Sequence, residues 1–208
     1  MTEVASGHRP PGVVTLVFGR YSDYVWGLRP LFTICLLLFT FSLVMGFHLG
    51  DRIPGELLEE VMGSFPDVES LSFPMLFLFI FANNVFKSFL WMVLGVLFSA
   101  PSLFFTVLNG FIVGWFSHSI AMERGLTFTA AALIPHGVIE IPTILLSSAA
   151  GMALGYQLIN RLRGRGGLRA ELGRALRLFI WRIVPLLLFS ALVEVTVTPM
   201  VILLLGLG

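Results

Sequence analysis

Long apolar segments limit this chain to one kind of architecture. Five of them approach or exceed the roughly 20 residues that an α-helix needs to cross a bilayer; they lie at about 31–49, 73–98, 101–120, 137–159 and 180–205. Hydrophobic residues make up 57% of the 208 residues and charged residues only 12%, about half the share that is usual in soluble domains. We therefore predict an all-α, polytopic membrane helix bundle with about five transmembrane helices.

The remaining segments divide the chain into two parts. Residues 1–29 are expected to form an amino-terminal segment, and 30–207 a single transmembrane domain. Within that domain the apolar stretch 127–134 is too short to cross a membrane, so it predicts a re-entrant or interfacial half-helix. The one cysteine, Cys35, excludes an intrachain disulfide.

The distribution of arginines predicts how the bundle is oriented. If the amino terminus is inside, three arginines of the first tail and six of the predicted basic loop 161–177 lie on the cytoplasmic side, against only Arg52 and Arg124 outside. Cytoplasmic loops of membrane proteins carry this excess. We expect a cell-membrane protein with a cytoplasmic amino terminus and an external carboxyl terminus. Its surroundings are the lipid bilayer, whose anionic head groups the arginines could also hold, and no nucleic-acid partner is expected.

A polar motif lies inside one of the apolar segments. Residues 134–142 read IPHGVIEIP and place His136 and Glu140 four residues apart. Pro135, Gly137 and Pro142 predict a break in the backbone around the carboxylate. A charged carboxylate at membrane depth costs about 2.5–3.5 kcal/mol on insertion scales, so it is expected to have a partner or a task.

Other polar residues fall into two depth levels when the rise of an α-helix is counted along each span. The asparagines lie near mid-depth, and two histidines and two glutamates lie above them. This predicted intramembrane cluster comprises Asn83, Asn84, Asn109, His118, His136, Glu140 and Glu194. Lys87 falls roughly 12 Å from Glu194 in depth by the same rise, which makes it a doubtful partner for that carboxylate.

The cluster has a structural and a functional interpretation. Asparagines commonly hydrogen-bond neighbouring membrane helices, and the carboxylates could cap broken backbone or bond an asparagine. Alternatively the group handles protons or ions. Imidazole and carboxylate side chains are metal ligands, so a divalent metal such as zinc is the one cofactor to consider; its candidate ligands are His118, His136, Glu140 and Glu194.

Two further patterns concern helix packing and catalysis. Gly110 with Gly114, and Gly151 with Gly155, are small-xxx-small pairs that permit close approach of helices. The chain has neither a His-Glu-x-x-His motif nor a Gly-x-Ser-x-Gly elbow. We therefore do not expect an enzyme.

The polar motif also carries a family resemblance. Pro135-His136-Gly137-x-x-Glu140-x-Pro142 resembles the stage II sporulation protein M family, and the resemblance extends over about 73–199. The other residues that fit are Asn83, Asn84, Asn109, Gly110, Gly151, Gly155, Glu194 and Pro199. The family is described as five-helix integral membrane proteins, whose founding member is an enzyme-free anchor that recruits two peptidoglycan-cleaving proteins.

Two functions follow as alternatives. The resemblance implies a non-catalytic membrane scaffold that organises other membrane or cell-envelope proteins. The polar cluster instead favours a small transporter or channel for protons or a divalent cation, in which a broken segment lines the path. Five spans are few for a lone transporter, so this alternative predicts a homo-oligomer, with a dimer favoured.

Overall fold

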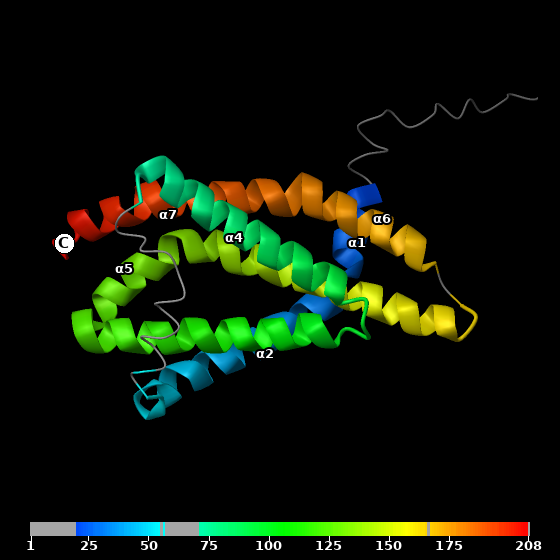
Figure 1. The fold of residues 1–208 in the computed structure, drawn as a ribbon, viewed down its shortest axis with the longest axis horizontal. Coiled ribbons are helices and arrows are strands. Elements are labelled where there is room, and N and C mark those ends of the chain that lie inside the picture. The colour runs from blue at the N-terminus through cyan, green and yellow to red at the C-terminus, as the bar shows by residue number, and fades with distance from the viewer. Residues whose placement is uncertain (1–19, 55, 57–70, 166, 208) are drawn as a thin grey trace, which may run out of the picture.

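The described part of the chain consists of helices and short connections (Figure 1). The computed structural model describes residues 20–54, 56, 71–165 and 167–207. Its elements are α1 (Arg20–Gly27), α2 (Arg29–Leu49), the 3-10 turn η2 (Gly50–Arg52), α4 (Phe73–Leu94), α5 (Ala100–Leu162), α6 (Leu168–Leu178), the π-helical turn η4 (Phe179–Ile183) and α7 (Val184–Leu204). The predicted all-α fold is confirmed.

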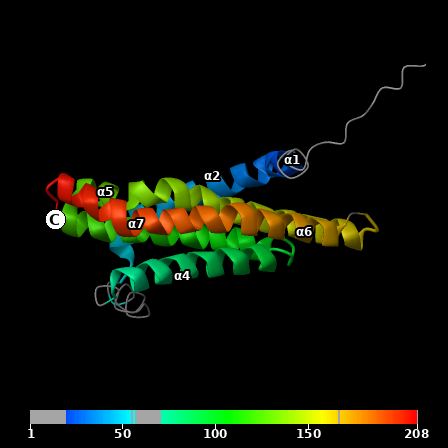
Figure 2. The same ribbon diagram turned by 90° about the horizontal axis from the view of Figure 1, so that it is seen from above.

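Four helical runs among the described residues are long and apolar enough to cross a membrane. They are Arg29–Arg52, Phe73–Leu94, Ala100–Leu162 and Leu168–Leu204. These runs form three layers, with α5 and α7 in the middle, α2 on one side and α4 on the other (Figure 2). The chain is therefore a multi-pass membrane protein.

The longest helix, α5, is a hairpin of two helical arms. Its 63 residues are interrupted at Gly125, where φ is +85° and ψ is 161°. Glycine adopts this conformation without the steric cost that a Cβ would add. The chain folds back there (Figure 1), so 100–124 form a first arm and 126–162 a second arm.

The structure places the backbone break differently from the sequence prediction. The second arm is helical through Pro135, Gly137 and Pro142, and residues 127–134 are its first turns and not a separate half-helix. A proline inside a soluble helix costs about 3 kcal/mol. Membrane helices tolerate it because neighbouring helices and hydroxyl side chains satisfy the freed carbonyl groups. The second arm bends early in its course (Figure 1), as expected of a helix with two prolines.

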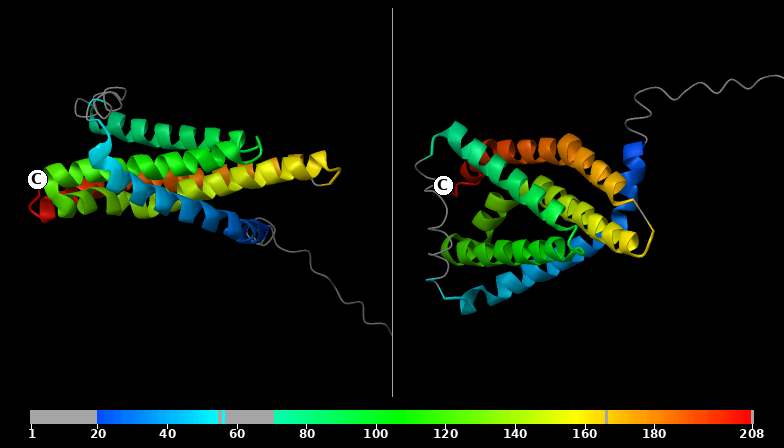
Figure 3. Two further views of the ribbon diagram at one scale, coloured as in Figure 1. Left: turned by 90° about the horizontal axis from the view of Figure 1, so that it is seen from below. Right: turned by 45° about the vertical axis from the view of Figure 1, so that its right-hand side comes forward.

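Glycines bring α2 into close contact with the first arm of α5, and the two run side by side (Figure 3). A Cβ added at Gly114 would collide with the Leu43 carbonyl oxygen and lie 2.8 Å from the Phe47 nitrogen. One at Gly110 would lie 2.5 Å from the Phe39 carbonyl oxygen. Only the absence of a Cβ lets the two backbones approach this closely.

The other glycine pair lines the contact between the second arm of α5 and the end of α4. A Cβ at Gly151 would lie 2.9 Å from the Met92 carbonyl oxygen, and one at Gly155 would lie 2.6 Å from that of Gly95. The turn after α4 is held to the same arm because the Ser99 hydroxyl donates to the Met152 carbonyl oxygen at 2.9 Å. Both predicted glycine pairs therefore lie at helix contacts.

The two ends of the bundle differ in charge. α1, α6 and the end of α5 lie at one end, with most of the arginines, and the Gly125 turn and the carboxyl terminus lie at the other (Figure 1). Most of the basic segment 161–177 is helical, and α6 continues through η4 into α7. Of the acidic segment that follows α2, residues 55 and 57–70 lie outside the described part.

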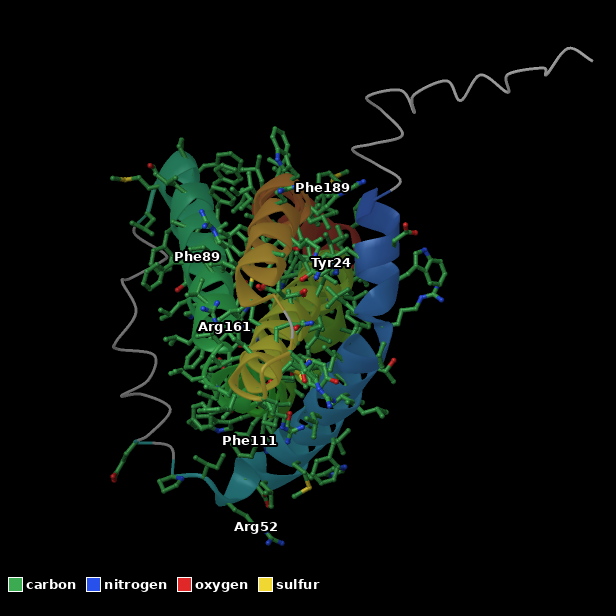
Figure 4. All side chains as sticks on the ribbon, turned by 90° about the vertical axis from the view of Figure 1, so that its right-hand side faces the viewer. Tyr24, Arg52, Phe89, Phe111, Arg161 and Phe189 are labelled. Atoms are coloured by element: carbon green, nitrogen blue, oxygen red, sulfur yellow. The ribbon has the colours of Figure 1, made fainter. Side chains whose placement is uncertain are left out.

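An ion pair with a buried carboxylate lies at the arginine-bearing end. Glu171 of α6 is buried and its Oε2 accepts a hydrogen bond from Arg174 at 2.5 Å. The Arg174 guanidinium also lies 5.4 Å from the centre of the Tyr24 ring of α1. Figure 4 views the molecule from this end, with Tyr24 between α1 and α6. This contact ties α1 to α6.

Candidate functional site

Two carboxylates and an imidazole from two helices meet inside the bundle. His136 and Glu140 lie on the second arm of α5, and Glu194 lies on α7. One ligand atom from each lies within 4.8 Å of the other two, and all three side chains are half-buried. Residues four apart share a helix face, so His136 and Glu140 face α7 together.

Two hydroxyl groups of α7 complete this side of the site. The Ser190 Oγ lies 3.3 Å from Glu140 Oε2 and 3.3 Å from the His136 carbonyl oxygen, so it can donate to either. The Thr198 Oγ1 lies 3.5 Å from His136 Nδ1. Ser190, Glu194 and Thr198 follow one another at intervals of four residues, which places them on one face of α7. That spacing around Glu194 was the sequence signal that could have identified both hydroxyls.

Helix α4 contributes an amide and an ammonium group. The side chains of Asn84 and Lys87 both lie within interaction range of the Glu140 carboxylate. Asn83 lies beside Asn84, with its Nδ2 3.5 Å from Asn84 Oδ1. The two depth levels that the sequence predicted thus meet at Glu140. Depth counting assumes upright helices, which is why it did not identify Lys87 as a neighbour of this carboxylate.

Two residues of the predicted cluster lie elsewhere. The His118 ring packs edge-on against Phe47, with 5.5 Å between ring centres, and lies where a Cβ on Gly50 would collide with it. The four metal ligands predicted from sequence therefore reduce to three. Asn109 is on the first arm of α5, next to Gly110, whose contact is with α2.

The three remaining side chains form a donor set that suits a divalent cation. Zinc binds imidazole nitrogen and carboxylate oxygen at about 2.0–2.2 Å in tetrahedral sites, which separates ligand atoms by about 3.3–3.6 Å. Ligand atoms within 4.8 Å of one another reach that spacing by small side-chain rotations. In the described part of the chain no other group of three histidine, cysteine or acidic residues is arranged in this way.

The fold and this site define a class: a multi-pass membrane protein with a polar site between its spans. Residues 35–199 match the model of the family described as Stage II sporulation protein M. The chain belongs to that family, and the matched residues include every side chain of the site.

Two archaeal proteins are similar to this chain. Uncharacterized protein MJ0793 of Methanocaldococcus jannaschii is 26% identical over 168 residues, which cover 79% of this chain and 91% of the relative. Uncharacterized protein MJ0706 of the same organism is 29% identical over 124 residues, 57% of this chain and about half (54%) of the relative. No solved structure matches the chain.

Proposed function

We propose that this member of the stage II sporulation protein M family conducts protons or a divalent cation across the membrane through the site formed by His136, Glu140 and Glu194. The observation that carries the proposal is the convergence of these groups within 4.8 Å from two separate helices. Ionisable residues within membrane spans are rare and mark ion pathways and proton relays. Sites of this kind in transporters lie between helices, within the membrane.

A purely structural role explains the site less well. Asparagine and serine hydrogen bonds between membrane helices contribute only about 0.6 kcal/mol on average, whereas each ionised carboxylate costs about 2.5–3.5 kcal/mol to insert. The site contains two carboxylates, Glu140 and Glu194, and each of three helices contributes polar groups to it. The helices could pack without either carboxylate, so a task for them accounts better for their presence.

The arginines indicate the orientation of the site, and the number of residues on each side of Glu140 indicates its depth. The end that carries α1 and α6 faces the cytoplasm, according to the excess of arginine there. Glu140 is 15 residues from Gly125 and 22 residues from Leu162, or about 22 Å and about 33 Å along an ideal helix. The site therefore lies nearer the outer end, and an ion from it must cross the longer inner part of the bundle.

The working unit in this proposal is a dimer. Helix α4 exposes large apolar side chains on one side of the helix, namely Met75, Leu78, Phe86 and Phe89. Two copies joined along such a face would provide ten spans, closer to the size of other transporters. Mass measurement of the protein in detergent or nanodiscs tests the number of copies.

A non-catalytic scaffold is the second candidate. The same exposed apolar faces of α4 and α2 could bind the spans of other membrane or cell-envelope proteins. In that case Glu140→Gln would disturb folding or assembly, and the purified protein would conduct no ion.

A liposome flux assay separates the two candidates. Purified protein is reconstituted, and the movement of protons and of Zn²⁺ is recorded for wild type, Glu140→Gln and Glu123→Gln. Glu123 is an exposed residue beside the Gly125 turn, so its substitution removes the same charge outside the site. We expect flux in wild type and Glu123→Gln and none in Glu140→Gln. A wild type without flux of either ion would overturn the transport proposal and leave the scaffold.

Metal analysis tests the nature of the ion. Stoichiometric zinc in the purified protein, lost in Glu140→Gln and in His136→Ala, is the expected result if the site holds a metal. Zinc that persists in both variants would exclude this site as its location.

A further inference from the structure

Most buried serine and threonine hydroxyls in the described part of this bundle have a hydrogen-bond partner there, but two serines do not. Membrane helices normally satisfy a buried serine or threonine with a carbonyl one turn earlier in the same helix. Thr106 donates to the Ser102 carbonyl oxygen at 2.8 Å, and Thr143 to that of Ile139 at 2.6 Å. The hydroxyls of Ser88 and Ser148 are also buried, each residue being 1% exposed, yet neither has a hydrogen-bond partner among the described residues.

Ser88 lies on α4 and Ser148 on the second arm of α5, at one level of the bundle where these two helices are in contact. Ser147, which precedes Ser148, is also 1% exposed, and its hydroxyl donates across the interface to the Ser88 carbonyl oxygen at 2.8 Å. This cross-helix bond shows that Ser88 lies at the same depth along the bundle as Ser147 and Ser148. We call these three residues the serine layer.

The serine layer lies directly inward of the site. α4 and the second arm of α5 run in the same direction, toward the arginine-bearing end (Figure 1). Ser147 follows Glu140 by seven residues, which is two turns on the same face and about 10 Å inward. Ser88 follows Lys87, whose ammonium is in range of Glu140.

Hydroxyl groups continue beyond the serine layer toward the arginine-bearing end. The Ser102 hydroxyl donates to the Trp91 carbonyl oxygen at 3.0 Å, and the Ser99 hydroxyl donates to that of Met152 at 2.9 Å. These two bonds join residues 11 and 53 positions apart along the chain. Together with the serine layer they form a series of polar groups from Glu140 to the turn between α4 and α5.

An unsatisfied buried hydroxyl costs about 1–3 kcal/mol. Ser88 and Ser148 could avoid this cost by bonding their own helix, as Thr106 and Thr143 do. Buried polar atoms of this kind in native proteins are commonly satisfied by internal water, which needs two to four polar partners. The hydroxyls of the serine layer provide such partners, because those of Ser88 and Ser148 are unpaired within the described chain and that of Ser147 can still accept a hydrogen bond.

The charges at the site indicate which ion such water would carry. With both carboxylates ionised, His136 neutral and Lys87 charged, Glu140, Glu194 and Lys87 sum to −2 + 1 = −1. One proton makes the site neutral, whereas a divalent metal leaves it at +1. Net charge is costly in a medium of low dielectric constant, so the balance favours the proton.

We infer that the serine layer, Ser88, Ser147 and Ser148, binds water and forms the inner half of a proton path that begins at Glu140. The inference rests on the proposed function and specifies that the conducted ion is the proton. Each water or hydroxyl accepts a proton from one neighbour and passes a proton to the next. Only O–H bonds form and break, and no other reactant is needed.

Proton flux through liposomes tests the path. In Ser88→Ala/Ser147→Ala the flux is expected to fall by about tenfold or more, the effect of losing one hydrogen bond from the rate-limiting barrier. Thr106→Val is the matched control, because that hydroxyl is equally buried but bonded to its own helix; its flux should stay within about twofold of wild type.

The outcomes separate this inference from the proposed function. If Glu140→Gln abolishes flux while the double serine variant conducts protons as wild type does, the path is wrong and the site stands. If the wild type moves Zn²⁺ but not protons, the choice of ion is wrong. If the wild type moves neither, the proposed function itself fails.

Water at the serine layer can be detected without any substitution. In water-edited solid-state NMR of serine-labelled protein in lipid, polarisation moves quickly from water to side chains in contact with it. The Ser88, Ser147 and Ser148 signals should build up faster than that of Ser42, which is 3% exposed and bonded to the Phe39 carbonyl oxygen. Build-up no faster than that of Ser42 would overturn the inference even if every variant failed to fold.

Discussion

The two sides of this bundle both use close glycine contacts, but only one of them also holds the polar site. Where α2 meets the first arm of α5, glycines at 46, 110 and 114 bring backbone against backbone. Where α4 and α7 meet the second arm, polar side chains face one another and some hydroxyls lack a protein partner. Lipid offers no hydrophobic force between helices, so close packing must hold them together. The second side is also packed through Gly151 and Gly155 toward its inner end, so close packing supports the fold on both sides while the polar site lies on the second side.

The largest expected effect breaks the packed side. Gly114→Leu places a side chain where even a Cβ would lie 2.8 Å from both the Leu43 carbonyl carbon and the Phe47 nitrogen. Because backbone atoms cannot rotate away, we expect a loss of about 3 kcal/mol or more in the free energy of unfolding, or failure to accumulate. Thermal unfolding in detergent measures it. A loss below about 1 kcal/mol would show that α2 and α5 are not in close contact.

A smaller effect is expected on the polar side. Ser190→Ala removes the hydroxyl that lies between Glu140 and the His136 carbonyl oxygen. One hydrogen bond to a charged group contributes about 1.5–3 kcal/mol, so we expect a loss near the lower value at these 3.3 Å distances. Chemical unfolding measures the change. Thr196→Ala is the control, because Thr196 is exposed and bonds its own helix; equal losses in both variants would contradict a special role for Ser190.

An effect of opposite sign is expected outside both interfaces. A Cβ on Gly173 of α6 would meet nothing within 4 Å, and glycine within a helix costs about 0.5–1 kcal/mol relative to alanine. Gly173→Ala should therefore stabilise the protein by up to that amount, in contrast to any substitution at Gly114. A loss of stability in the same unfolding assay would mean that α6 is not helical there.

The smallest effect at neutral pH is expected at Tyr24. Burial, together with the neighbouring Glu171 carboxylate, raises the pKa of the Tyr24 hydroxyl above its usual value of about 10. The folded protein then keeps this proton where the unfolded chain loses it, so the stabilisation is complete below pH 10 and is lost as the pH rises above 10. Tyr24→Phe should change stability little at pH 7 and reduce the decline above pH 10. Parallel declines in both proteins would contradict the burial of this hydroxyl.

The architecture was accessible from sequence because length and hydropathy determine what can cross a membrane. The course of α5 was not. Local rules place a break at Pro135 and Pro142, but neighbouring helices compensate a proline within a membrane bundle, and the break instead falls at Gly125. The helix α6 was also missed, since the arginines of 161–177 favoured the prediction of a loop.

The candidate site was predictable only in part, because the sequence gives the local spacing of residues but not the direction in which a side chain points. The spacing of His136 and Glu140 is local, so a shared face follows directly. The meeting of Glu140 with Glu194 was a hypothesis from depth alone, which does not indicate the direction in which a side chain points. That is why depth grouped His118 with these residues although it faces Phe47, and why it missed that Lys87 lies within electrostatic range of Glu140.

The meeting of the carboxylates of Glu140 and Glu194 is the claim on which the site depends. Solid-state NMR of glutamate-labelled protein in lipid measures it through polarisation transfer between the two carboxyl carbons. With ligand atoms within 4.8 Å of one another, we predict a direct cross-peak that disappears in Glu194→Gln and persists in Glu123→Gln. Its absence in the wild type, with both carboxyl signals resolved, would show that the two carboxylates lie apart and that the site does not exist.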